Sequence, residues 1–108
     1  MAPAVRFEDE AAEELAAAVD WYDHRRPGLG SAFLAALDAT SSAIARRPAR
    51  FPLVPGVPPD LGVRRALLQR FPFAVVFIEL ASEIRVLAIA HGRRKPGYWR
   101  DRVPRTST

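Results

Sequence analysis

The chain has 108 residues, of which 49% are apolar, and it contains no cysteine. This length suits one domain with its own core, and the apolar fraction excludes a disordered chain. The lack of cysteine excludes disulfides and thiolate metal sites and fits a reducing cytoplasm. No apolar run approaches the roughly 20 residues that span a bilayer, and the first residues lack the pattern of a signal peptide.

Charge is distributed unevenly along the chain, although the net charge is only +4. Up to Val63 there are six basic and nine acidic residues, and from Arg64 onward ten basic and three acidic residues, which gives net charges of −3 and +7. A one-sided field of this kind predicts a polyanionic or acidic partner for the C-terminal part.

The first predicted elements are a short strand and a helical hairpin. Residues 4–7 alternate in polarity, as an edge strand does. Acidic residues follow at once, and apolar residues then recur every three or four positions, which predicts a helix over residues 9–24. Pro27-Gly28 ends this helix, Gly30-Ser31 is predicted to cap a second helix, and Pro48 stops that one. So short a connection predicts antiparallel packing of the two helices.

The second half of the chain predicts three strands after a loop. Residues 48–59 hold five of the ten prolines, which indicates an extended surface loop. Residues 61–70 suit a strand with an exposed or functional side, residues 73–80 are apolar on both faces like a central strand, and residues 84–90 complete a hairpin. The predicted fold is α+β: an N-terminal helical hairpin packed on a small antiparallel sheet, in a single domain that ends in a basic tail.

The first candidate for chemistry is His91, where the last strand runs into the basic tail of residues 92–108. Imidazole titrates near neutrality and can move a proton in either direction. RNA cleavage by 2′-hydroxyl attack needs a base, an acid and cations for the developing charge. His91, with Lys95 or Tyr98, and Arg93 could supply these groups. The alternative is a histidine that is hydrogen-bonded at a strand end for structural reasons.

A second set of candidates would contact phosphates or a protein target. These residues are Arg64, Arg65, Arg93, Arg94, Lys95 and Trp99. Arginines bind phosphates, and flat aromatic rings stack on unpaired bases. The alternative for Trp99 is burial at the edge of the core, where the ring would anchor the tail. Of the two rings, Tyr98 is predicted to be the more exposed. Arg64 and Arg65 point to opposite faces of one strand, and the sequence leaves open which of them faces the site. Trp21-Tyr22 is predicted to be core packing.

No nucleotide-binding or zinc-protease motif is present, and only two histidines occur, so neither a cofactor nor a metal is predicted.

Several short stretches, taken in their order along the chain, form a pattern that can be compared with known families. They are Trp21-Tyr22 at the end of the first helix, the turn Arg26-Pro27-Gly28-Leu29-Gly30 leading to Phe33-Leu34, Arg64-Arg65 with Leu67, Arg70-Phe71-Pro72-Phe73 with Val75 and Val76, and the ending from Ala88 to Trp99, AIAHGRRKPGYW. In this order the series resembles the RelE/ParE superfamily, the toxins of type II toxin–antitoxin ("plasmid stabilisation") modules. The turn and the ending are more similar to the ParE-like branch.

The resemblance implies two N-terminal helices on a small antiparallel sheet, in a bacterial cytoplasmic protein that halts growth when free. It also implies a cognate antitoxin, whose C-terminal segment wraps the toxin. Because ParE-like members inhibit DNA gyrase, gyrase binding is the expected action. One alternative is a RelE-like, ribosome-dependent and metal-independent mRNA endoribonuclease, with His91, Arg93 and Tyr98 as catalytic residues. Another is a non-toxic regulatory protein that only binds the antitoxin.

Overall fold

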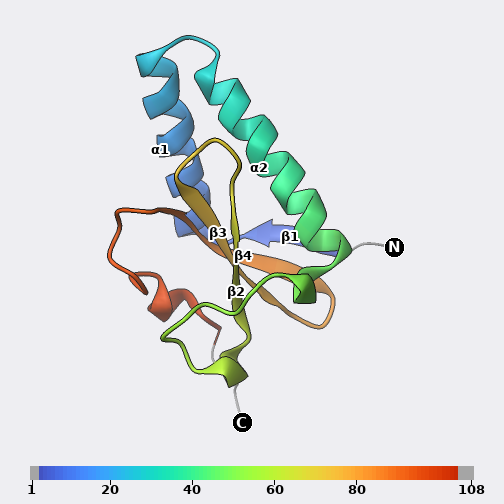
Figure 1. The fold of residues 1–108 in the computed structure, drawn as a ribbon. Helices are drawn as coiled ribbons and strands as arrows, with labels where there is room; N and C mark the ends of the chain where they lie inside the picture. Colours follow the sequence, from blue (N-terminus) through green and yellow to red (C-terminus); the bar gives the residue numbers. More distant parts are fainter. Residues whose placement is uncertain (1–2, 105–108) are drawn as a thin grey trace.

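The computed structural model describes residues 3–104, and its elements follow the predicted order (Figure 1). The helices and strands are β1 (Ala4–Phe7), α1 (Asp9–Arg25), α2 (Leu29–Arg46), β2 (Val63–Leu67), β3 (Phe73–Glu79) and β4 (Glu83–His91). Single turns of 3-10 helix form η1 (Pro48–Arg50), η2 (Pro59–Leu61) and η3 (Arg100–Arg102). Over these described residues, no helix has the length and apolar character needed to cross a membrane.

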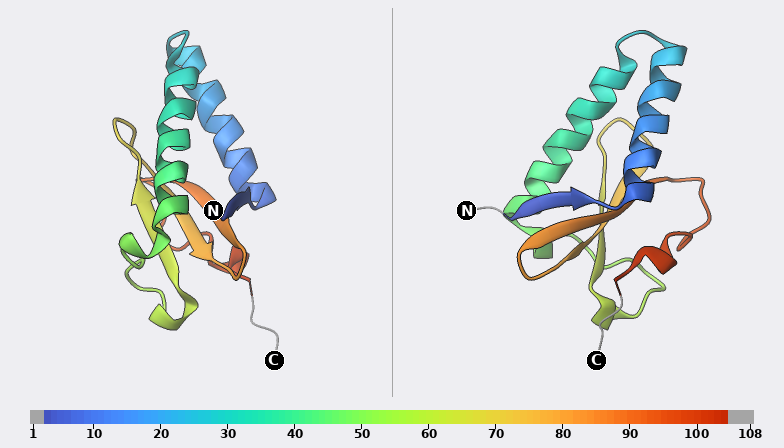
Figure 2. Two further views of the ribbon diagram at one scale, coloured as in Figure 1. Left: turned by 90° about the vertical axis from the view of Figure 1, so that its right-hand side faces the viewer. Right: turned by 180° about the vertical axis from the view of Figure 1, so that it is seen from behind.

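The helical hairpin forms as predicted, but its turn is capped differently. Gly28, not Gly30-Ser31, precedes the first turn of α2, and its φ of 94° is a conformation that glycine adopts without strain. Gly30 lies inside α2, where its N–H donates to Asp23 Oδ1 at 2.8 Å. A Cβ at Gly30 would lie 2.7 Å from that carboxylate, so this contact between the helices requires glycine. The tip of the hairpin extends beyond the sheet (Figure 2).

The sheet has the strand order β1-β4-β3-β2. As predicted, β2, β3 and β4 form an antiparallel meander, and β1 is an edge strand. β1 runs parallel to β4, so the complete sheet is mixed. The connection is long enough to permit this parallel pairing, because the helical hairpin and two further strands separate β1 from β4 in the chain. β1 pairs only with Glu83 to Val86, which leaves the outer edge of β4 without a neighbouring strand beyond Val86.

Both faces of the sheet are covered, as the apolar sequence of β3 predicted. Val75 and Phe77 face the helices and join a core with Phe33 and other residues of α1 and α2. Val76 and Ile78 face the other way and join a second, smaller cluster that includes Trp99. The alternation along β3 therefore distributes its side chains between two apolar layers. The second layer is covered by chain segments that lie outside the helices and strands.

The proline-rich loop was predicted to be an extended surface loop, but it also forms backbone hydrogen bonds with the sheet. It contains η1 and η2, and between them the chain runs beside the free edge of β2. Val54 N–H donates to Val63 O at 2.9 Å, and Arg65 N–H donates to Pro52 O at 3.1 Å. The loop thus covers an edge that would otherwise present unpaired backbone groups.

Candidate functional site

The chain after β4, residues 92–104, forms a compact segment that we call the C-terminal segment. Backbone turns order it: Arg94 N–H donates to His91 O at 3.0 Å, and Tyr98 N–H donates to Lys95 O at 3.2 Å. Gly97 has a φ of 79°, which favours glycine, and η3 follows. The basic triplet Arg93-Arg94-Lys95 is therefore carried on a folded segment, and all three side chains are exposed.

Glu14 of α1 holds this segment in place through both carboxylate oxygens. Tyr98 Oη donates to Glu14 Oε2 at 2.7 Å, and Arg102 donates from Nη1 to Oε1 at 3.0 Å and from Nη2 to Oε2 at 3.2 Å. The side chains of Glu14 and Arg102 are only 16% and 13% exposed. Hydrogen bonds between such charged, largely buried partners are stronger than neutral ones. α1 and the C-terminal segment are thereby fastened together.

The same two side chains complete the open edge of β4. Ile89 N–H donates to Glu14 Oε1 at 3.0 Å, and Arg102 Nη1 donates to Leu87 O at 3.0 Å. Both backbone groups lie beyond Val86, where pairing with β1 has ended. Side chains thus replace a fifth strand and satisfy groups whose burial without partners would be costly.

Tyr98 is more exposed than Trp99, as predicted, but it is not free in solvent. Its ring is half-buried, with the Arg94 guanidinium 3.8 Å from the ring centroid and Arg102 at 5.2 Å on the same ring. Burial, and then the hydrogen bond to Glu14, raises the pKa of Tyr98 to about 12. A phenol that holds its proton this firmly and donates it to a carboxylate is a poor general base or acid near neutral pH.

This shifted pKa predicts a loss of stability in strong alkali. An unfolded tyrosine ionises near its ordinary pKa of 10.0, whereas Tyr98 in the fold stays protonated to about 12. Between these values the unfolded chain binds fewer protons, so the free energy of unfolding should fall as pH rises. Urea unfolding from pH 9 to 12 would measure this fall, and Tyr98→Phe should reduce it. Burial also raises the pKa of Tyr22, so we attribute to Tyr22 the pH dependence of stability that remains in Tyr98→Phe. An unchanged slope in Tyr98→Phe would contradict the assignment.

The two tryptophans lie in opposite environments, and only Trp21 departs from its predicted place. Trp99 is 3% exposed and lies in the second apolar cluster with Val57 and Leu87, so the structure supports the core-anchor interpretation and its ring is not presented to a ligand. Trp21, predicted as core, is 53% exposed, and the Arg25 guanidinium lies 4.5 Å from its ring centroid. Tyr22 does pack on the core, where its ring stacks on Phe33 with centroids 5.5 Å apart.

His91 lies at the end of β4, partly buried against Phe73, with ring centroids 5.0 Å apart. Its Nδ1 accepts the backbone N–H of Arg93 at 3.0 Å. The neutral imidazole therefore carries its own proton on Nε2. Arg93, named from the sequence as a charge stabiliser, is exposed and contacts His91 through its backbone.

Arg64 and Arg65 point to opposite faces of β2, as the strand alternation requires, and only Arg65 lines a hollow together with other candidate residues. Arg64 lies on the helix side of β2, where its Nη1 donates to Phe51 O at 2.6 Å and so fastens the start of the loop. Arg65 is exposed on the opposite side, the side of Val63 and the second cluster. It lines a hollow of about 490 Å³ together with His91 and Lys95.

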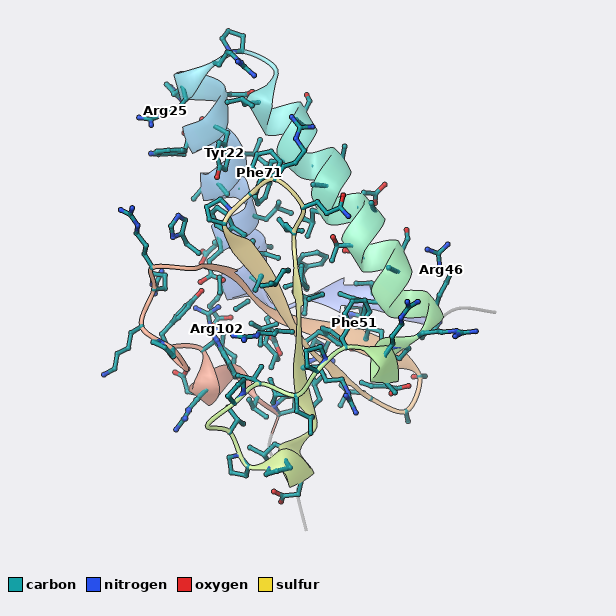
Figure 3. All side chains as sticks on the ribbon, in the orientation of Figure 1. Tyr22, Arg25, Arg46, Phe51, Phe71 and Arg102 are labelled. Carbon is teal, nitrogen blue, oxygen red and sulfur yellow. The ribbon has the colours of Figure 1, made fainter. Side chains whose placement is uncertain are left out.

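A larger hollow of about 690 Å³ lies between α1 and the C-terminal segment; two of its residues, Tyr22 and Arg25, are labelled in Figure 3. Its lining is mostly aromatic and apolar, with two arginines: Glu14, Ala17, Ala18, Trp21, Tyr22, Arg25, Leu29, Pro72, Phe73, Ile89, His91, Arg94 and Tyr98. Pro72, Phe73, His91, Arg94 and Tyr98 line both hollows, so the two meet at the end of the sheet. We call the two hollows together the cleft.

A model of the ParE toxin of type II toxin–antitoxin systems (parDE) matches residues 5–96. The chain belongs to the ParE toxin family. Its structure is also similar to a solved chain from a chromosomal ParDE TA system of P. aeruginosa, with a TM-score of 0.69 and 23% sequence identity. That alignment covers 82% of this chain and 95% of the other, and at this identity it shows a common fold. No curated protein matches the chain.

The match to the ParE family ends at Pro96, before Tyr98, Trp99 and Arg102. The family match therefore does not reach these three residues, and only the structure shows that they anchor the C-terminal segment of this ParE-family chain. Sequence reasoning missed Glu14 and Arg102 as members of the site. A signal did exist for Glu14, which interrupts the buried stripe of α1 between Ala11 and Ala18 at helical spacing. An acidic residue on a core-facing stripe requires a partner, but the sequence does not say which one.

Proposed function

We propose that this ParE-family chain is a bacterial growth-inhibiting toxin that binds DNA gyrase in the cytoplasm and is neutralised by a cognate antitoxin. The match of residues 5–96 to the ParE toxin family carries the proposal. The structure adds a physical basis for binding, because Glu14 and Trp99 anchor a segment whose exposed triplet is Arg93-Arg94-Lys95. A charged surface that is already ordered loses little conformational entropy when it binds.

The state of the candidate catalytic residues supports target binding over RNA cleavage. Tyr98 donates its proton to Glu14 and has a pKa of about 12. His91 has one ring nitrogen engaged by the backbone of Arg93, so its other nitrogen and the ammonium group of Lys95 are the groups that remain for proton transfer. Cleavage by 2′-hydroxyl attack is fastest with both a base and an acid in place.

The antitoxin part of the proposal is supported by the cleft. Trp21 and Phe73 give it an apolar lining, and Arg25 and Arg94 place two cations on it, each stacked on an aromatic ring. An amphipathic segment with acidic residues beside large apolar ones has the complementary chemistry. The positive charge of the C-terminal part, +7 from Arg64 onward, favours the same kind of partner.

One observation favours the second candidate, an mRNA endoribonuclease. His91, Arg65, Arg94 and Lys95 line one hollow on the side of the sheet away from the helices. A histidine among cations is a plausible environment for a transferring phosphate, with His91 moving the proton. This candidate makes His91 essential, whereas the gyrase proposal does not.

The experiment that tests the function compares gyrase activity with message integrity after induced expression of the chain. We expect growth arrest with intact mRNA, and inhibition of supercoiling by purified gyrase. Arg93→Gln/Arg94→Gln should weaken inhibition about tenfold or more, since it removes two exposed charges from the contact surface. The matched control Arg6→Gln/Arg70→Gln removes the same charge from exposed positions outside the cleft and should inhibit normally. Co-expressed antitoxin should restore growth.

Two outcomes would contradict this proposal. New 5′ ends within translated codons, found by primer extension and lost in His91→Ala, would establish the endoribonuclease. Absence of any growth arrest from well-folded protein would instead leave only the non-toxic, antitoxin-binding role.

A further inference from the structure

The end of α2 carries three arginines that have no part in the cleft. Arg46 is the last residue of α2, Arg47 follows it, and Arg50 ends η1. Pro48 stops the helix, and the N–H of Arg50 donates to Arg47 O at 3.1 Å. This single 3-10 turn folds the chain back, so that the three arginines stay together instead of spreading along a longer helix. All three are exposed.

These arginines surround a hollow of about 510 Å³ that is lined by Ala43, Arg46, Arg47, Arg50 and Phe51. No carboxylate belongs to that lining, and among residues 3–104 none of the three arginines forms an ion pair. Other arginines of the chain are neutralised: Arg85 by Glu8 and Glu83, and Arg102 by Glu14. A single cation at the C-terminal end of a helix is stabilised by the helix dipole, but three like charges around one hollow repel each other, and an anionic partner would offset that repulsion.

This surface is separate from the C-terminal segment. Figure 3 shows Arg46 and Phe51 near the end of α2 and Arg102 well away from them, where it is bonded to Glu14 of α1 at the edge of β4. The half of the chain that contains the cluster has a net charge of −3, so the cluster is a local exception.

We propose that the hollow at Arg46, Arg47 and Arg50 is a phosphate-binding site for the backbone of a nucleic acid. The planar guanidinium presents paired N–H donors that match phosphate oxygens. The exposed carbonyls at the C-terminal end of a helix carry partial negative charge and disfavour a single small anion bound close to them. Long arginine side chains can instead reach away from the helix end to successive phosphates of a polyanion, so a nucleic acid fits this position better than a single small anion. Phe51 is half-buried, and the lining holds no fully exposed large apolar side chain for an acidic peptide to cover. This inference goes beyond the gyrase proposal and does not depend on it.

The test is the salt dependence of DNA binding, measured by fluorescence anisotropy with a labelled mixed-sequence duplex. Each phosphate contact contributes about 0.9 to the slope of log K against log salt, so Arg46→Gln/Arg50→Gln should lower the slope by roughly two. Its affinity should fall about tenfold or more at low salt. The matched control Arg6→Gln/Arg26→Gln removes equal charge from exposed positions that line neither this hollow nor the cleft, and should keep the wild-type slope. Thermal unfolding by circular dichroism checks that both variants are folded.

Three results would overturn the proposal. An equal loss in the two double variants would show that net charge alone governs DNA binding. Displacement of DNA by polyglutamate as effectively as by unlabelled duplex would indicate an acidic protein as the partner. Saturable binding of tripolyphosphate that depends on Arg46 and Arg50, with DNA affinity unchanged in their double variant, would indicate a small phosphate compound.

Discussion

Replacing Glu14 by alanine should lower the free energy of unfolding by about 3–5 kcal/mol, the usual cost of removing one partner of a buried ion pair. The substitution leaves Arg102, whose side chain is 13% exposed, without its carboxylate. It also removes the acceptors of Tyr98 Oη and of Ile89 N–H. In a domain of this size such a loss would lower the Tm by roughly 10 °C or more. The C-terminal segment would lose its attachment to α1.

The neighbouring residue supplies the control for this experiment. Glu13 is exposed on the same helix, so Glu13→Ala should change stability by no more than about 0.5 kcal/mol. Glu14→Gln keeps the shape but loses the charge, and should fall between the wild type and Glu14→Ala. Urea unfolding of the three variants would measure the series. Equal stability of Glu13→Ala and Glu14→Ala would show that the carboxylate network contributes nothing to the fold.

Truncating Trp99 to alanine should cost a further 3–5 kcal/mol, the range for a large aromatic side chain removed from a core. Trp99 is 3% exposed and packs with Val57 and Leu87 between the C-terminal segment and the sheet. Its loss opens the second apolar cluster and releases the segment that presents Arg93 to Lys95. Growth inhibition should therefore fall together with stability.

The chain contains an internal control for this substitution as well. Trp21→Ala removes the same side chain from a site that is 53% exposed, and should change the free energy of unfolding by less than about 1 kcal/mol. Chemical unfolding of both variants, followed by circular dichroism, gives the comparison. A cost for Trp21→Ala as large as that for Trp99→Ala would mean that the burial of the two rings is not what determines their contribution.

Most of the fold was predictable because its signals are local. The three- and four-residue spacing along α1, the stop at Pro48 and the continuous apolar run of β3 each depend on neighbouring residues only. The resemblance to RelE/ParE toxins covered nearly the whole chain, and the family match over residues 5–96 agrees with it. Element ends were less accurate: β2 is five residues long where ten were expected, since the loop and the β2–β3 turn occupy the rest.

The candidate site was predictable only in part, since the predicted residues have separate environments. His91, Arg65, Arg94 and Lys95 do share one hollow. Arg64, in contrast, holds the loop through Phe51 O. Two adjacent positions of the sequence therefore lie in different environments: Arg65 lines the hollow, and Arg64 holds the loop.

The sequence by itself determined the family, the order of helices and strands, the two-layer arrangement and the concentration of positive charge after Val63. Periodicity and composition carry these properties, and they need no knowledge of distant contacts. Only the tertiary structure decided that β1 joins β4 in parallel, that Trp99 is buried while Trp21 is exposed, and that Glu14 binds Tyr98 and Arg102. Those partners are 84 and 88 residues away from Glu14, and no local pattern encodes which of many charges meets a given one across the fold.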